Sequence, residues 1–464
     1  MLIKDFLENV CDQIRYKPIR NDISEELSLH IQEMKEEHLN YGISEKEAEE
    51  RAVANMGDAT EIGKKLDKIH RPKFDWILFL LVTILIGFGF LVSSIRVQRI
   101  GEDSVYYLKR HIVFFIIGLF FSLGVYFFDY RKIVRKYKIV YGISSAIMIF
   151  AMLFGFRTVG VHTWILIGRF HHVDPSNICV FLYVIAFAGM ISNLDKKICN
   201  INIEKINLKF RVDIFKVIIL SAISIVFISI ASGITVSIIL LLSYIVISTA
   251  NIISSKENVK KNLLKLYGVF ISLGIILIIF SIVTQNGLYY RILRGINSTY
   301  NYQNYTERGG FVPYKINEVL ESANMFSGLD DMETYFGLFD GGTNHALITV
   351  IAYYGISFGI VIISTVILLA VKLIMDYRKV KDTSGRLLII GLGSTILLQA
   401  IFNILMNLNL IPITDVNLPF VSYGINGLLV NMISIAFVLS IYRRKDILNK
   451  KENYKKIKFK ISYE

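Results

Sequence analysis

From residue 75 onward the chain alternates long apolar runs with short polar connections. Stretches such as Ile214–Ile230 and Ile234–Ile247 hold no charged residue apart from Lys216. A helix needs about 20 mostly apolar residues to cross the hydrocarbon core of a bilayer. The pattern therefore predicts an all-α membrane protein of about ten transmembrane helices, near residues 75–95, 112–129, 139–156, 177–193, 214–231, 233–250, 266–284, 345–371, 387–410 and 424–442.

Residues 1–72 are polar and amphipathic, and they predict four short helices around a small core. Phe6, Val10 and Ile14 recur one helical turn apart, and Gly57 is expected to end the third helix. Helix starts are indicated at Asp22-x-x-Glu25, Ser44-x-x-Glu47 and Asp58-x-x-Glu61. We expect a cytoplasmic helical prefix domain over 1–72, a transmembrane domain over 75–445 and a basic cytoplasmic tail over 446–464.

Composition supports the membrane assignment, and charge orients the helices. The chain is 53% hydrophobic and 19% charged, with a mean hydropathy of +0.51. Its net charge of +13 would suit nucleic acid. However, the basic residues gather in the loops after the second, fourth, sixth and eighth predicted spans, as in cytoplasmic loops of membrane proteins. We therefore expect both termini in the cytoplasm and no nucleic-acid partner.

Cysteine usage and the N-terminus add two further expectations. Cys11, Cys179 and Cys199 show no disulfide or metal-binding spacing. The N-terminal segment lacks the apolar core of a signal peptide, so the first span is expected to direct insertion.

Three segments on the expected outer side carry a recognisable pattern. They are GVHTWILIGRFHHVDPSN (Gly160–Asn177), LFDGGTNHALITVIAYYG (Leu338–Gly355) and NLNLIPITDVNLPFVSYGINGLL (Asn407–Leu429). Together with the ten spans and a large outer loop over 285–344, they resemble the SEDS family of FtsW, RodA and SpoVE across residues 75–445. Those proteins are membrane glycosyltransferases that polymerise a lipid-linked peptidoglycan precursor. The most specific match is P-x-T-x-x-x-L-P-F-x-S-Y-G, from Pro412 to Gly424.

The resemblance implies a protein of the bacterial plasma membrane that handles an undecaprenyl-linked precursor in growth, division or sporulation. It implies membrane lipids and a penicillin-binding protein transpeptidase as partners. No cofactor is implied, and a divalent cation stays open. The prefix domain, through EELSLHI, YGISEKEAEERAVANMGD and IHRP, resembles the prefix of some bacterial permeases, which implies docking or regulation. The resemblance implies substrate-binding roles for Trp164, Ser176, Thr343, Thr414, Pro419, Ser422, Tyr423 and Gly424.

The residues themselves leave a simpler interpretation of these segments open. Pro412, Pro419 and Gly424 favour a non-helical stretch that lines a wet cavity or is buried in protein. A plain loop turning back into the membrane would carry the same residues. Trp164 could equally be an interfacial anchor.

Several charged positions of the family pattern are altered. The family segment L-P-E-x-H-T-D-F carries a proposed catalytic Asp, which falls on Asn344, and its Glu falls on Asp340. Asn cannot take a proton from a sugar hydroxyl. The family's Q-P-S-E becomes Asp174-Pro175-Ser176-Asn177, and its T-G becomes Thr414-Asp415. Either the site is rebuilt with Asp340 as the base, or the chain is a non-catalytic scaffold or regulator of a cell-wall synthesis complex.

Two other classes have less support. A small-molecule permease would be expected to show intramembrane carboxylates or an inverted repeat, and the spans show neither. Histidines at positions 162, 171, 172 and 345, with Asp174 nearby, could suit zinc. Since adjacent histidines such as His171 and His172 rarely both face one ion, no metal site is predicted.

Overall fold

The computed structural model describes residues 2–99, 104–157, 163–167, 171–199, 208–254, 288–301, 311–329 and 343–446, with a few positions between 268 and 279. The chain divides into two compact units, Met1–Phe74 with Tyr442–Glu464, and Asp75–Ile441. The predicted all-α class is confirmed, since helices dominate the described residues of both units. Apart from its first residue, the predicted tail 446–464 lies outside the described residues.

The first unit is a small helical domain with its own core. It contains α1 (Leu2–Asp12), a 3-10 turn (Lys17–Ile19), α2 (Arg20–Asn40), α3 (Glu45–Met56) and α4 (Ala59–His70). Its buried core consists of Phe6, Val10, Ile14, Ile19, Ile23, Ile31 and Ala52. The apolar periodicity of residues 6–14 therefore predicts the buried face correctly. α4 packs closely on α1, because a Cβ on Gly63 would lie 2.6 Å from Gln13 Cβ.

Of the three predicted helix starts, only the one at Asp58 has a side-chain cap. Asp58 caps α4, since its Oδ1 accepts a hydrogen bond of 2.9 Å from Thr60 N. This bond and those from the Thr60 hydroxyl lower the pKa of Asp58. Gly57 ends α3 with a φ of 88°. In contrast, Ser44 makes no side-chain capping bond, and Asp22 lies inside the first turn of α2 rather than before it.

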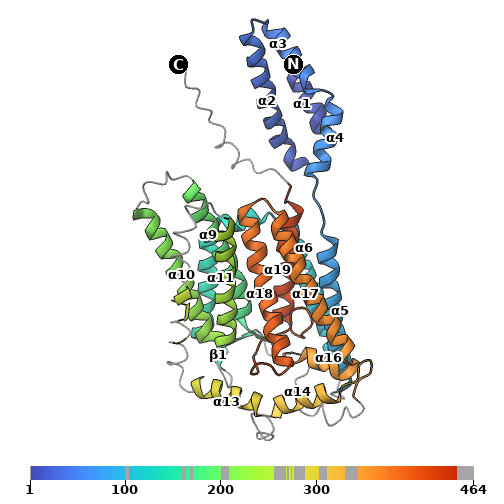
Figure 1. Cartoon of the computed structure of the whole chain (residues 1–464), viewed down its shortest axis with the longest axis vertical. Helices are drawn as coiled ribbons and strands as arrows, with labels where there is room; N and C mark the ends of the chain where they lie inside the picture. Colours follow the sequence, from blue (N-terminus) through green and yellow to red (C-terminus); the bar gives the residue numbers. More distant parts are fainter. Residues whose placement is uncertain are drawn as a thin grey trace. The chain divides into compact units, whose positions relative to one another are not determined.

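The second unit is a bundle of membrane-length helices (Figure 1). Its helices are α5 (Trp76–Arg99), α6 (Ser104–Phe127), α7 (Tyr130–Arg135), α8 (Tyr137–Phe154), α9 (Pro175–Cys199), α10 (Leu208–Ser232), α11 (Ile234–Ser254), α13 (Leu288–Tyr300), α14 (Phe311–Ser322), α16 (Ala346–Tyr354), α17 (Ile356–Lys379), α18 (Thr383–Asn407) and α19 (Ile425–Arg443). Within the described residues, 9 helices are long and apolar enough to span a membrane. Of these helices, α9, α18 and α19 are the most buried inside the protein. The predicted span 266–284 lies almost wholly outside the described residues.

The predicted eighth span, 345–371, is interrupted. Gly355 has a φ of 93°, which separates α16 from α17. The break leaves backbone groups without helical partners. Residues after α14 satisfy them: Ile356 N and Ser357 N donate to the carbonyls of Asn324 and Met325, both at 3.0 Å. The break was not predicted because the apolar run continues through it. The helix long enough to span the membrane is α17 alone.

One end of the bundle carries most of the irregular structure, and we call it the α16 end. In Figure 1, α13, α14 and α16 lie there, as does β1. Three short strands, β1 (Phe156–Arg157), β2 (Thr163–Ile167) and β3 (His171–Val173), pair antiparallel in the order β1-β2-β3. The sequence did not predict this small sheet, nor the helices α13 and α14 within the loop 285–344.

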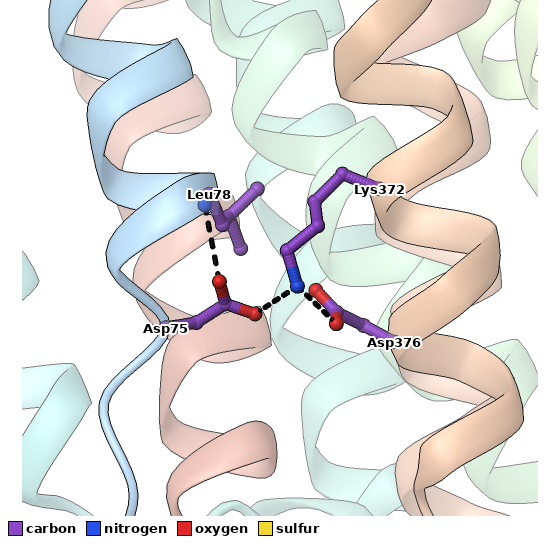
Figure 2. A network of polar contacts seen from close by, with 4 residues as sticks. All are labelled: Asp75, Leu78, Lys372 and Asp376. Carbon is purple, nitrogen blue, oxygen red and sulfur yellow. Dashed lines mark hydrogen bonds and ion pairs between the residues drawn. The ribbon is translucent and has the colours of Figure 1, made fainter.

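A buried charge cluster joins α5 to α17 (Figure 2). Lys372 of α17 donates hydrogen bonds to Asp75, just before α5, and to Asp376, one turn further along α17. Asp75 also caps α5 by accepting from Leu78 N at 3.1 Å. Asp75, Lys372 and Asp376 are only 4%, 5% and 0% exposed. Because 297 residues separate Asp75 from Lys372, this cluster fastens the first transmembrane helix to a distant one.

Candidate functional site

The centre of the candidate site is the connection between α18 and α19, residues 408–424, which we call the α18–α19 segment. Its backbone is non-helical over most of its length, yet Val416, Leu418, Phe420 and Val421 are all nearly inaccessible to solvent. Irregular backbone within a membrane bundle must find internal hydrogen-bond partners. The segment is therefore held by protein on several sides, as the predicted cavity-lining or buried stretch requires.

Two asparagines on α18 supply many of those partners. Asn403 Nδ2 donates to Val416 O at 2.7 Å and to Asn344 O at 2.8 Å. Asn407 Nδ2 donates to Asn344 O at 3.0 Å, and its Oδ1 accepts from Ile348 N at 3.2 Å. Both asparagines have relative exposures of 0%. They tie the start of α16 and the α18–α19 segment to one helix face.

Ser422 makes a second link between the same two segments. Its hydroxyl donates to Thr343 O at 2.6 Å and accepts from Leu418 N at 2.8 Å. Phe420 has a positive φ of 66°, uncommon for a residue with a Cβ. The hydrogen bonds around it hold that conformation. Two of the three sequence segments are thus joined through side chains that the family pattern contains.

Helix α5 approaches this segment at a glycine. A Cβ on Gly89 would lie 2.5 Å from Phe420 O, so only glycine allows this spacing. Beside it, the buried ring of His111 on α6 stacks on Tyr423, with 5.8 Å between ring centroids. Tyr423 therefore has a packing role. Gly424 follows with a φ of 148°, and α19 begins at the next residue.

A polar pocket lies where the first and third segments meet. It encloses about 460 Å³ including its open mouth. Its lining comes from the start of α9, from α10, α11, α18 and α19, and from the α18–α19 segment. The lining residues are Asp174, Asn177, Val180, Ser232, Val236, Ile239, Gln399, Asp415, Val416, Asn417 and Gly427.

Buried hydroxyls without partners occur in and beside this pocket. Ser232 is 3% exposed, lines the pocket, and its Oγ makes no hydrogen bond with the described residues. Ser176 is 0% exposed, and its Oγ also makes no hydrogen bond with the described residues. Its backbone N donates to Asp174 Oδ1 at 2.9 Å in the first turn of α9. Buried polar atoms are almost always hydrogen-bonded in folded proteins, so an unsatisfied hydroxyl in a pocket is typical of a ligand or water site.

Among the described residues, those predicted to bind substrate are not in the pocket lining. Ser422 and Thr343 join two segments, and Thr414 N donates to Met406 Sδ at 3.0 Å. Pro419 is buried. Trp164 pairs with Phe156 through the sheet. The roles in substrate binding assigned to this set remain predictions.

Asn344 precedes His345, the residue before α16, and is partly exposed. Its backbone carbonyl accepts both α18 asparagine side chains. Asp340, the alternative base, lies outside the described residues, as does His162. Among the described residues, no group of three or more His, Cys, Asp or Glu side chains has a metal-binding arrangement.

Sequence reasoning missed the polar stripe on α18. Gln399, Asn403 and Asn407 are spaced by four residues on a helix that is otherwise mostly apolar, so they share one face. Polar side chains inside a membrane span are costly unless they have a partner or a function. That spacing is the signal that could have located the site.

The fold and this site define a class: a polytopic membrane protein with a pocket formed beside an irregular connection between two spans. The family model of FtsW, RodA and SpoVE, described as "Cell cycle protein", matches residues 73–447. The chain belongs to this family, which confirms the assignment to the SEDS proteins of cell-wall synthesis.

Known relatives agree with that assignment. A probable peptidoglycan glycosyltransferase FtsW of Trichlorobacter lovleyi is 22% identical over 81% of this chain and 96% of its own length. One from Enterococcus hirae is 35% identical, but the match covers only 20% of this chain and 23% of that protein.

Solved structures show the same fold. One described as "Structural coordination of polymerization and crosslinking by a peptidoglycan synthase complex" has a TM-score of 0.60 at 16% identity, covering 80% of this chain and 98% of that chain. The rod shape determining protein RodA of Thermus thermophilus has a TM-score of 0.53 at 16% identity, covering 80% and 97%.

Proposed function

We propose that this protein binds a lipid-linked peptidoglycan precursor in the pocket beside the α18–α19 segment. The observation that carries the proposal is that two of the altered motif segments line one polar pocket, which also contains the unsatisfied hydroxyl of Ser232. Carboxylates, amides and hydroxyls are suited to the many hydroxyl groups of a sugar. Family membership supports this ligand class.

We further propose that the α16 end faces the outside of the bacterial plasma membrane and that both termini are cytoplasmic. The basic residues Arg378 and Lys379 end α17 at the opposite side from α16. Helix α7, with Arg131 and Lys132, lies at that side too, because Tyr130 Oη donates to Asp382 Oδ2, beside the start of α18, at 2.8 Å. A basic side is typical of the cytoplasmic face.

The orientation can be tested by thiol labelling of intact cells. A cysteine at the exposed Asn301 should react with a membrane-impermeant reagent, and one at the exposed Lys136 should react only after lysis. The reversed pattern would show that the proposed orientation is wrong.

Precursor binding can be measured directly on the purified full-length chain in lipid nanodiscs. Titration with a lipid-linked disaccharide-peptide precursor should give saturable binding. Asn417→Leu should weaken it at least tenfold, because a pocket amide is replaced by an apolar group of similar size. Asn301→Leu, at an exposed position outside the pocket lining, is the matched control. Equal binding by native and Asn417→Leu proteins would show that the precursor does not bind in this pocket.

A second candidate function is a non-catalytic scaffold. The amide at Asn344 favours it, since the position aligned with the family's proposed base cannot ionise. Such a scaffold would bind precursor, or a penicillin-binding protein transpeptidase, without forming glycan. A glycan-polymerisation assay on the purified chain separates the two functions, because only an enzyme consumes the precursor.

A further inference from the structure

We propose that Asp415 is the catalytic base of this protein and that the pocket it lines holds the attacking sugar. This inference rests on the proposed function and adds a reaction to it. Asp415 lies on the α18–α19 segment, between Thr414 and the buried Val416, and its side chain is exposed while lining the pocket. A carboxylate in that place can accept a proton from a bound hydroxyl.

The pocket lies next to the position that Asn344 occupies. A single nitrogen, Asn403 Nδ2, contacts Asn344 O at 2.8 Å and Val416 O at 2.7 Å. The two carbonyl oxygens are therefore neighbours, and Val416 follows Asp415 directly in the chain. Val416 also lines the pocket, so the start of α16 lies close to the pocket lining. The carboxylate thus need not come from α16.

Of the two carboxylates in the pocket lining, Asp415 is the more exposed to solvent. Asp174 already has a structural role, because its Oδ1 accepts Ser176 N at 2.9 Å in the first turn of α9. An aspartate at that position satisfies a free backbone N–H group of the helix. Asp415 precedes no helix. Asp174 would help to bind the sugar, and Asp415 would take the proton.

Other lining residues of the pocket independently indicate a hydroxyl-bearing ligand. Ser232 ends α10, is 3% exposed, and its Oγ lacks a hydrogen-bond partner among the described residues. Asn177, Gln399 and Asn417 add amide groups around the same space. Amides and hydroxyls both donate and accept hydrogen bonds, as sugar hydroxyls do. The lining therefore suits a sugar better than an apolar lipid chain.

The reaction balances without a co-reactant. The hydroxyl oxygen of the acceptor sugar attacks the anomeric carbon of a second lipid-linked precursor. The bond from that carbon to the pyrophosphate oxygen breaks, and the lipid pyrophosphate leaves with the electron pair. Asp415 takes the hydroxyl proton and later releases it to water.

Turnover and binding must be measured together on the full-length chain in nanodiscs, with the lipid-linked disaccharide-peptide precursor as the probe. We expect Asp415→Asn to lower the polymerisation rate on the order of 10²–10⁴-fold and to change precursor affinity less than about threefold. Glu321→Gln, the same chemical change at an exposed site on α14, should alter neither.

Each other result is decisive. A native protein that binds precursor without polymerising it overturns the catalytic role of Asp415 and leaves the binding function standing. A full rate in Asp415→Asn also overturns it. If the native protein does not bind precursor, both the proposed function and this inference are wrong.

A labelling experiment tests contact with the substrate without relying on turnover. Asp415→Cys, at an exposed position of the pocket lining, should react with a water-soluble thiol reagent faster than the native cysteines. Saturating precursor should slow this reaction at least tenfold. Glu321→Cys should label at the same rate with and without precursor. Unprotected labelling of Asp415→Cys by a protein that binds precursor would place the sugar elsewhere.

Discussion

Replacing Lys372 with Met should expose the energetic role of the charge cluster between α5 and α17. The change keeps most of the side-chain volume but leaves Asp75 and Asp376 as two adjacent buried carboxylates without a cation. Removing one partner of a buried ion pair typically costs about 3–5 kcal/mol. The chain can limit that cost only by protonating a carboxyl.

The cost of protonation gives an independent magnitude. An Asp with an unperturbed pKa of about 3.9 requires roughly 4 kcal/mol to be kept neutral at pH 7 and roughly 1.5 kcal/mol at pH 5. In Lys372→Met the folded state would bind more protons than the unfolded state, so its stability rises as pH falls. We therefore expect a destabilisation of about 4 kcal/mol at pH 7 that shrinks to about 1.5 kcal/mol at pH 5.

The assay is reversible chemical unfolding of the full chain in mixed micelles at both pH values. Lys379→Met is the matched control, because Lys379 is exposed on the same helix. The neutral triple variant Asp75→Asn, Lys372→Met, Asp376→Asn should recover most of the lost stability, since it leaves no unpaired charge. A loss below about 1 kcal/mol at pH 7, or a triple variant as unstable as Lys372→Met, would refute this reasoning.

Three further predictions concern local contacts. Asn403→Ala and Asn407→Ala should each lower the unfolding free energy by about 1–3 kcal/mol, because each leaves buried backbone groups unsatisfied; unchanged unfolding curves would contradict this. Gly89→Ala should destabilise by about 1–3 kcal/mol through overlap with the segment's backbone. Gly87→Ala, which meets no atom within 4 Å, should be neutral or stabilising, and equal effects would exclude the close contact. The fragment 1–74 should melt cooperatively by circular dichroism. Because the pKa of Asp58 is lowered in the folded state, its contribution is fully present above the unfolded pKa of about 3.9 and is lost as pH falls from there through the lower folded pKa. The stability difference between native and Asp58→Ala fragments should therefore shrink as pH falls below about 3.9.

The sequence by itself determined the membrane class, most of the spans and the family. Each span is a local property of about 20 residues, so the apolar runs around α5, α9 and α18 identify helices without knowledge of their neighbours. The pattern from Pro412 to Gly424 is local too, and it was enough to indicate the family and an irregular stretch. The buried face of α1 followed from simple periodicity.

Tertiary structure alone decided how distant residues meet. The break at Gly355 depends on Asn324 and Met325, whose carbonyls accept the freed N–H groups. The sequence of the run 345–371 does not predict those partners. Lys372 is an unusual charge in a span, but its second carboxylate lies 297 residues away at Asp75.

The pocket follows the same rule. Asp174 and Asp415 looked like isolated departures from a family pattern, far apart in the chain. Packing of α9 and α18 against the α18–α19 segment brings them into one pocket, with Ser232 from a third helix. Contacts of this kind come from the close packing of whole helices. That packing follows from the complete set of side chains at each interface and cannot be obtained from local periodicity.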